Sequence, residues 1–493
     1  MEWLAILPPL VAIVLALVTR EVLLSLVIAV FMGATIIAGN PLGGFLELLN
    51  NQLIGALTDP WNVSILLFCL MIGGLIGIVD KNGGTKGLAS LMVKRAGSKK
   101  TALFSTWALG IVIFFDDYAN SLIVGNAMKG ITDRMKISRE KLAYIIDSTA
   151  APVSSMALIS TWVGMELGLI QEGLAQISVD MGAYDVFLRS IPYRFYSILA
   201  LVFVLIIIFT GRDFGPMRKA EIAAQKKRID EVIEDVDLGS KKWYNAIVPI
   251  LSVIVITVIG LYYNGGGFEG LSIQEAFSNA DASVVLLWAS FSGIIIAWTM
   301  SIITKSLKVN EIADAFIEGV KSMVVPSMIL ALAWTLGSIN GELGTAKLMV
   351  RIIGDNLPSG FVPVILFMVT ATVAFSTGTS WGTNAIVMPI AIQLGYLTGG
   401  VEMIVPAVGA VLTGAVMGDH VSPISDTTIL SSMSSGCEHI SHVRTQIPYA
   451  LTVAAAAIIF GFIPAGFGVN PILSHTLAIA ALYAVVRFLG KAD

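Results

Sequence analysis

The chain has 493 residues, of which 56% are hydrophobic and 13% are charged, and its formal net charge is -4. A soluble protein of this size does not carry so large an apolar fraction, so the composition predicts an all-α polytopic membrane protein. The small net charge argues against nucleic acid as a partner. Cys69 and Cys437 lie far apart in the sequence and do not indicate a disulfide framework.

Apolar runs of about 20 residues, the length that spans a bilayer, recur along the whole chain. The predicted spans lie near residues 4–19, 21–39, 61–80, 186–210, 243–263, 283–303, 321–340, 446–466 and 470–488. Two further zones, 101–170 and 361–435, are apolar but interrupted by polar clusters. The longest hydrophilic stretch, 212–242, mixes basic and acidic residues and indicates a solvated linker with a helical part.

Basic residues indicate which loops face the cytoplasm. The stretches 40–60, 171–185 and 264–282 contain no Lys or Arg, whereas 81–100 and 129–141 are rich in both. Because the two basic stretches share a side, the residues between them must enter and leave the membrane by one face, as a re-entrant hairpin. The pattern predicts a multi-pass protein of the cytoplasmic (inner) membrane with its N-terminus outside and its C-terminus in the cytoplasm.

The two halves of the chain resemble each other. Shifting the chain by 260 residues, without a gap, pairs Gly33 with Gly293 and Gly77 with Gly337. The same shift pairs the Gly-Thr step at 84–85 with that at 344–345. The first copy is predicted to hold an odd number of crossings plus one hairpin, so the second copy runs with inverted topology. Inverted repeats are typical of secondary transporters, whose substrate site lies where the halves meet.

This repeat gives the predicted domain organisation and fold class. The predicted fold is two inverted-topology repeats with re-entrant hairpins and broken transmembrane helices. The first inverted repeat covers residues 1–215, with a hairpin near 101–128 and a broken helix near 142–170; a cytoplasmic linker covers 216–242; the second repeat covers 243–468, with a hairpin near 361–397 and a broken helix near 401–435; and an extra C-terminal transmembrane helix covers 469–493.

Polar clusters mark each predicted hairpin turn and each predicted helix break. The turns carry FFDDYANS at 114–121 and FSTGTSWGTN at 375–384, and the breaks carry DSTAAPVSS at 147–155 and GDHVSPISDTT at 418–428. Groups this polar are costly in hydrocarbon and are usually functional. The proline in each break frees backbone carbonyls. Carbonyls, hydroxyls and carboxylates together form the oxygen shell that a hard cation such as sodium prefers.

The sequence therefore predicts one cation site between the two turns and the two breaks. Asp147, Asp419 and Asp426 are the predicted carriers of sodium and of the proton, since one buried carboxylate can hold either. Whether Asp116 or Asp117 faces the site stays open, and His420 is either a proton relay or a structural residue. The full predicted ligand set is Asp117, Asn120, Asp147, Ser154, Thr377, Ser380, Asp419, Ser425, Asp426 and Thr427.

The segment from Gly378 to Gly382 matches G-x-S-x-G, the nucleophile elbow of hydrolases. That motif requires a strand, a sharp turn and a helix in an α/β sheet, whereas here it interrupts a membrane hairpin, so we expect no enzyme. The sequence has no HExxH, paired CxxC or P-loop pattern. We therefore expect no resident cofactor and no ATP-driven transport.

Four of these motifs carry a resemblance to a known family. FFDDYAN at 114–120, DSTAAPVSS at 147–155, TSWGT at 379–383 and especially GDHVSPISDTT at 418–428 resemble the NhaC-type sodium/proton antiporter family of the ion-transporter superfamily. The resemblance covers nearly the whole chain. It implies that sodium leaves in exchange for protons, that the hairpin tips and broken helices form a transport domain moving against a scaffold as an elevator, and that the chain forms a homodimer.

The expected partners are therefore sodium ions, protons and the lipid bilayer. The alternative is a sodium- or proton-coupled transporter of a small organic solute on the same scaffold, either a carboxylate such as malate or lactate or an amino acid. In that case the TSWGT tip at 379–383 would bind the solute beside the ion. A passive channel fits two opposed hairpins less well than alternating access does.

Overall fold

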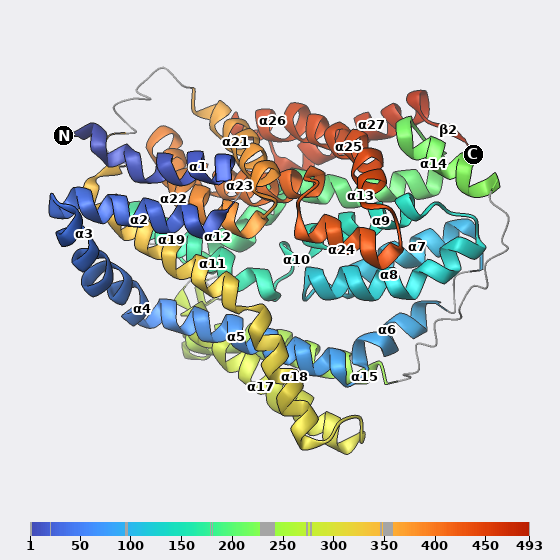
Figure 1. Ribbon diagram of the computed structural model, residues 1–493, viewed down its shortest axis with the longest axis horizontal. Helices are drawn as coiled ribbons and strands as arrows, with labels where there is room; N and C mark the ends of the chain where they lie inside the picture. Colours follow the sequence, from blue (N-terminus) through green and yellow to red (C-terminus); the bar gives the residue numbers. More distant parts are fainter. Residues whose placement is uncertain are drawn as a thin grey trace.

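The computed structural model describes residues 2–19, 21–93, 97–177, 179, 181–226, 242–272, 275–276, 279–345, 348 and 358–492. These residues are almost entirely helical, and the N- and C-termini lie at opposite ends of the long axis (Figure 1). Within this part of the chain 8 helices are long and apolar enough to cross a membrane, or up to 10 if each of two bent pairs forms one span. The helical membrane class predicted from composition is confirmed.

The first half of the chain contains short helices between longer ones. Its elements are η1 (Glu2–Ile6), α1 (Leu7–Thr19), α2 (Val22–Ala38), α3 (Pro41–Glu47), η2 (Leu48–Leu53), α4 (Ile54–Thr58), α5 (Pro60–Lys81), α6 (Gly84–Val93), α7 (Lys99–Val112), α8 (Asp117–Arg134), α9 (Arg139–Thr149), α10 (Ala151–Ser154), α11 (Thr161–Ile177), α12 (Ala183–Ser190), η3 (Ile191–Tyr193), α13 (Phe195–Thr210), β1 (Arg212–Asp213) and α14 (Gly215–Lys226).

The second half has fewer and longer helices. Its elements are α15 (Tyr244–Asn264), η4 (Gly267–Glu269), α17 (Ala282–Ile303), α18 (Val309–Ser322), α19 (Val324–Leu343), η6 (Ser359–Phe361), α21 (Val362–Thr377), α22 (Ser380–Gly399), α23 (Val401–Val421), α24 (Asp426–Ser435), α25 (His439–Ala456), η7 (Ala457–Phe462), α26 (Ile463–Gly466), α27 (Pro471–Leu489) and β2 (Lys491–Ala492).

The stretch 40–60, for which the sequence predicted no span, is mostly helical. α2 ends at Gly39, whose positive φ of 73° suits glycine, and Asn40 then caps α3 by accepting a hydrogen bond from the backbone N–H of Gly43 at 2.7 Å. Pro41 occupies the first turn of α3, where its missing N–H costs nothing. The chain consequently turns by 111° between α2 and the α3–α4 arm.

The helical part predicted for the linker is α14, and residues 227–241 of that linker lie outside the described part of the chain. Immediately before α14, β1 pairs in antiparallel fashion with β2, Arg212 opposite Ala492 and Asp213 opposite Lys491. The Arg212 guanidinium also donates to the carbonyl oxygens of Arg487 and Gly490, at 3.1 and 3.0 Å. The C-terminal end of α27 is therefore tied to the end of α13 (Figure 1).

A buried charge cluster connects α14 to α7 and α9. Glu221 of α14 accepts hydrogen bonds from the backbone N–H and the hydroxyl of Ser138, the N-cap of α9, at 2.8 and 2.6 Å. Its carboxylate also pairs with Lys99 at 2.8 Å and with Lys141 at 3.3 Å. Burial pushes the pKa of Glu221 upward, but the charges of Lys141 and Lys99 and the hydrogen bonds outweigh burial and leave that pKa lowered.

The substitution Glu221→Gln is expected to destabilise the protein by about 3 kcal/mol at neutral pH, because it leaves Lys141 buried with one fewer acidic partner. A lowered folded-state pKa means that the stabilisation is present above the unfolded pKa of about 4.3 and is lost as pH falls through the folded value. Thermal unfolding between neutral and acidic pH should therefore show the wild-type and variant curves converging on the acid side. A constant difference across that range would contradict this assignment.

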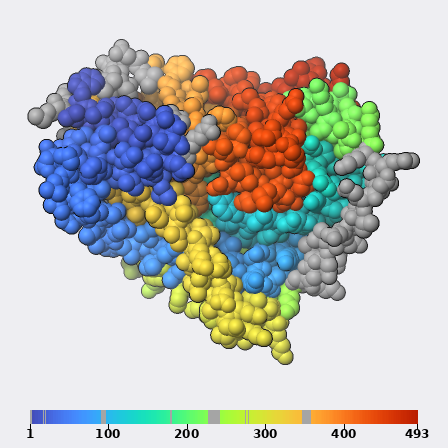
Figure 2. Space-filling view, in the orientation of Figure 1, coloured from blue at the N-terminus to red at the C-terminus, as the bar shows by residue number. Residues whose placement is uncertain are grey.

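Helices from the two halves of the sequence pack in parallel pairs. α8 lies along α24, with the Tyr118 hydroxyl 3.2 Å from Asp426 and the Ser121 and Ser431 hydroxyls 3.4 Å apart. α11 lies along α22 in the same way: Trp162 contacts Trp381 with ring centroids 5.7 Å apart, and Ile392 packs beside Gly173. Figure 2 shows the result on one face, where the orange-red C-terminal region lies against the teal helices of the first half.

Candidate functional site

The two hairpin tips are held by caps at the start of their second helices. At the α7–α8 tip, Asp116 caps α8 by accepting from the N–H of Ala119 at 2.7 Å, and its other oxygen accepts from the Thr161 hydroxyl at 3.1 Å. At the α21–α22 tip, Gly378 adopts a φ of 69° and Thr379 caps α22. Asp116 is thus a capping residue, and the adjacent Asp117 is the tip carboxylate left free of a capping role.

The break between α23 and α24 lies against the second tip. The Ser422 hydroxyl donates to the carbonyl of Phe375 at 2.8 Å, and Ser425 caps α24. The Pro423 carbonyl, freed by the break, is 2.7 Å from Nε2 of His439. α23 reaches this position only because it packs very closely on α21: a Cβ built on Gly418 would lie 2.1 Å from the carbonyl oxygen of Ala371.

Asp419 lies in the last turn of α23, at the edge of this break, and is only 4% exposed. Its carboxylate accepts from the Thr427 hydroxyl at 2.8 Å, and that hydroxyl lies 3.0 Å from the Ser425 hydroxyl. Asp117, 3% exposed, lies near enough for the two carboxylates to repel each other. In the part of the chain that the structure describes, no Lys or Arg forms an ion pair with Asp117 or Asp419.

Asp426 lies beside these two carboxylates but differs from them in burial. It begins α24 and is exposed, and it accepts a hydrogen bond from the Tyr118 hydroxyl at 3.2 Å. Tyr118 interacts electrostatically with Asp117, Asp426 and Asp419, which places it among the three carboxylates. The structure therefore gathers five of the predicted ligands in one region: Asp117, Asp419, Ser425, Asp426 and Thr427.

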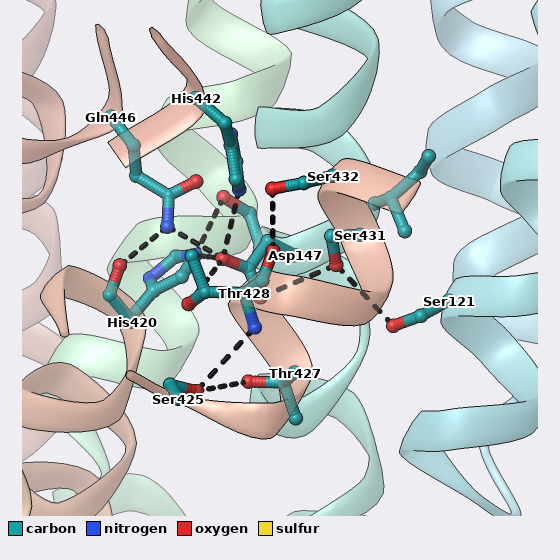
Figure 3. Close-up of polar contacts among 12 residues, drawn as sticks. Ser121, Asp147, His420, Ser425, Thr427, Thr428, Ser431, Ser432, His442 and Gln446 are labelled. Atoms are coloured by element: carbon teal, nitrogen blue, oxygen red, sulfur yellow. Dashed lines mark hydrogen bonds and ion pairs between the residues drawn. The ribbon is translucent and has the colours of Figure 1, made fainter. Parts of the chain in front are cut away.

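Asp147 of α9 has a different environment, which Figure 3 shows. Its carboxylate accepts from Gln446 Nε2 at 2.6 Å and from the Thr428 hydroxyl at 3.2 Å, and the Ser431 hydroxyl is 3.5 Å away. The imidazole of His442 lies 3.3 Å from it and that of His420 3.9 Å. A carboxylate has about four acceptor positions. N–H and O–H groups occupy those of Asp147, so it ties α9 to α24 and α25 and leaves little room for a cation.

His420 has partners at both ring nitrogens. Its Nδ1 lies 2.7 Å from the Tyr196 hydroxyl and its Nε2 3.3 Å from the Ser148 hydroxyl. Gln446 donates to the His420 carbonyl as well as to Asp147. Sequence reasoning did not select Gln446 or His442. Their signal was present, because His442 and Gln446 lie four residues apart in a helix and therefore share a face.

The hydrogen bonds of the other predicted ligands go mainly to backbone carbonyls. Asn120 donates through Nδ2 to the carbonyls of Gly110, Ile113 and Thr149, at 2.7, 3.0 and 3.0 Å, and so satisfies carbonyls that the breaks leave free. The Thr377 hydroxyl donates to Val373 at 3.0 Å and the Ser380 hydroxyl to Ala415 at 3.2 Å. The Ser154 hydroxyl is buried without a hydrogen-bond partner among the described residues.

A further buried ion pair lies next to the first break, at Ser155, and the sequence analysis did not select it. Arg194 and Glu166 are both fully buried and lie 3.0 Å apart. The Arg194 guanidinium also donates to the carbonyl of Ser155 and stacks over the Phe187 ring at 4.8 Å. This arginine therefore fixes the segment between α10 and α11.

Within the described ranges, no group of three or more His, Cys, Asp or Glu residues is arranged to hold a metal ion. A site of that kind suits transition metals, whereas sodium is held by hydroxyl, carbonyl and carboxylate oxygens. The residues around Asp419 and Thr427 supply oxygens of all three types. Broken helices whose polar groups meet inside an apolar helical bundle define a secondary membrane transporter.

Comparison with known proteins places this transporter in a family. The model of the Na+/H+ antiporter family matches residues 153–466. An uncharacterized protein of Haemophilus influenzae is 36% identical over 99% of this chain and 95% of its own length. The chain belongs to the Na+/H+ antiporter family, and the resemblance seen in its motifs to NhaC-type sodium/proton antiporters is confirmed.

Two other similarities are more distant. The malate-2H(+)/Na(+)-lactate antiporter of Bacillus subtilis is 28% identical over 33% of this chain and 35% of its own length. The solved structure of the YdaH transporter of Alcanivorax borkumensis superposes with a TM-score of 0.61 at 15% identity, covering 86% of this chain and 90% of that chain. The latter similarity concerns the fold alone.

Proposed function

We propose that the protein exchanges sodium ions for protons across the cytoplasmic membrane. The observation that carries the proposal is the pair of buried carboxylates, Asp117 and Asp419, which have no basic partner among the described residues. Two uncompensated negative charges at membrane depth are costly. A transported cation or a proton supplies the missing positive charge, and the two cannot occupy one carboxylate together, so they exchange.

The residues around the pair divide the work. Asp419 and Asp117 carry the ion, Thr427 and Ser425 add hydroxyl oxygens, and the break after α23 adds carbonyls. Asp426, exposed beside Tyr118, is the entry ligand. Asn120, Asp147, Ser154, Thr377 and Ser380, predicted as ligands, act in this proposal as supports for the tips and breaks. Sodium is the cargo, and no resident cofactor is involved.

The transport cycle that we propose uses two inverted repeats and an elevator motion. The parallel packing of α8 on α24 and of α22 on α11 supports it. In each pair, the second helix of the hairpin in one repeat packs on the second helix of the broken span in the other repeat. In Figure 1, α7 and α8 lie in the right half of the molecule and α21 and α22 in the left half. The external N-terminus, the cytoplasmic C-terminus and the homodimer remain parts of this proposal.

The proposal is tested in everted membrane vesicles that hold a pH gradient. Addition of sodium is expected to dissipate the gradient in vesicles with the wild-type protein and not in vesicles without it. Potassium chloride at the same concentration is the control for ionic strength. A wild-type response that is independent of sodium would overturn the proposal.

The second candidate is coupled transport of a small organic solute, for which the edge-on contact of Trp162 with Trp381 at the second tip offers an aromatic wall. One of the relatives named above, the Bacillus subtilis antiporter, is named for malate and lactate. Thermal unfolding with malate, lactate or basic amino acids, each with and without sodium, separates the two functions. Stabilisation by a solute only in the presence of sodium would favour the second candidate.

A further inference from the structure

A basic cavity lies at the end of the molecule that carries the C-terminus. Its volume is about 350 Å³, and its walls are the first residues of α14, with Arg218 and Lys219, and the chain end, with Leu489 and Lys491. Figure 1 shows α14 and β2 side by side there. The pairing of β1 with β2 brings the two walls together.

Among the residues that the structure describes, the positive charges of this cavity have no acidic partner. None of the salt bridges or side-chain hydrogen bonds formed within the described part of the chain involves Arg218, Lys219 or Lys491, and Nε of Arg218 is buried without a partner. The carboxylates near these residues along α14 and β1 are Glu221 and Asp213, and both have other partners. Glu221 pairs with Lys99 and Lys141, and Asp213 pairs with Lys141 and accepts from the Tyr449 hydroxyl at 2.7 Å. The charge of its lining therefore suits an anion.

The location of the cavity indicates the kind of anion. α27 is a candidate membrane span, and α13 forms one together with the bent segment Ala183–Tyr193; the two helices end at Leu489 and Thr210, next to the cavity residues. The apolar side chains of Phe488 and Leu489 are 84% and 63% exposed at its edge. The site has apolar side chains on the membrane side and three cations just beyond the ends of the spans. An anionic lipid matches this arrangement, because its acyl chains lie in the membrane and its charged headgroup lies just outside it.

We infer that this cavity binds the phosphate headgroup of an anionic phospholipid. Arg218, Lys219 and Lys491 neutralise the phosphodiester, and the first residues of α14, which line the cavity, place the positive end of the helix dipole there. The acyl chains lie along the exposed side chains at the end of α27. Because Asp213 and Glu221 link this region to α9, an occupied site also stabilises the cytoplasmic end of that helix.

The inference is tested by thermal unfolding of the full chain in detergent with added phosphatidylglycerol, phosphatidylcholine or sodium phosphate. Phosphatidylglycerol is expected to raise the Tm of the wild type more than phosphatidylcholine does. The half-saturating concentration should rise roughly fivefold for each charge removed in Arg218→Gln, Lys219→Gln and Lys491→Gln. Lys226→Gln is the matched control, because Lys226 is on α14 outside the cavity.

Three results would overturn the inference. They are equal stabilisation by the two lipids, an equal loss in Lys226→Gln, and equal stabilisation by sodium phosphate alone, which would assign the cavity to a soluble anion. The Tm of each variant without lipid shows whether it folds, and the single variants carry the test if their combination does not. Salt should weaken the effect of phosphatidylglycerol, since it screens charges at the interface.

Discussion

Replacing Asp419 with Asn is expected to abolish sodium-dependent dissipation of a pH gradient in everted vesicles, with a loss of roughly 100-fold or more. The reason is that removing the carboxylate from a buried pair of carboxylate and bound cation costs about 2–5 kcal/mol. The amide has nearly the same shape as the carboxylate and can still accept from the Thr427 hydroxyl. It removes the charge that attracts a sodium ion and the group that holds a proton. Loss of activity therefore reports on chemistry and not on packing.

The comparison with two other aspartates sharpens this test. Asp426→Asn is expected to raise the half-saturating sodium concentration while leaving the maximal rate largely intact, because Asp426 is exposed at the edge of the site and an asparagine there can still accept from the Tyr118 hydroxyl. Asp281→Asn is the control, since Asp281 caps α17 and asparagine caps as well. Full exchange activity in Asp419→Asn would remove Asp419 from the ion path and refute the proposed site.

The sequence predicted the class of the fold and the location of the polar breaks, because both are local properties. About 20 consecutive apolar residues already specify a membrane span. A proline among hydroxyls and carboxylates, as around Pro423, already specifies an interrupted helix. Ser425 and Asp116 then appear as the N-caps of α24 and α8 that their residue types favour.

The roles of individual polar residues were not readable in the same way, because they depend on contacts between distant segments. Asp147 was expected to be a cation carrier, but its acceptor positions face Gln446 and His442, almost 300 residues further along the chain. Asn120 was also predicted as a ligand; its Nδ2 donates to carbonyls at the end of α7 and at the end of α9, while its Oδ1 has no partner among the described residues. A periodic pattern specifies which face is buried but not which helix covers it.

Glu166 illustrates the same limit and leads to a second large effect. Sequence reasoning gave it no role, and the structure pairs it with Arg194 in a fully buried ion pair. Arg194→Met is expected to destabilise the protein by about 3–5 kcal/mol, because it leaves the Glu166 carboxylate buried without its counter-charge. Unfolding by heat or denaturant, followed through tryptophan fluorescence, measures the change.

The double variant Arg194→Met/Glu166→Gln is expected to recover much of that loss, because it removes both charges and buries no isolated carboxylate. Arg189→Met, five residues earlier, is the matched control: Arg189 pairs with Asp185 at 3.4 Å, but its side chain is 57% exposed, and such surface pairs contribute about 0–1 kcal/mol. If the double variant is no more stable than Arg194→Met, the loss comes from the freed carbonyl of Ser155 and from packing on Phe187. In that case Arg194 acts through its shape and hydrogen bonds at the first break, and its charge is dispensable.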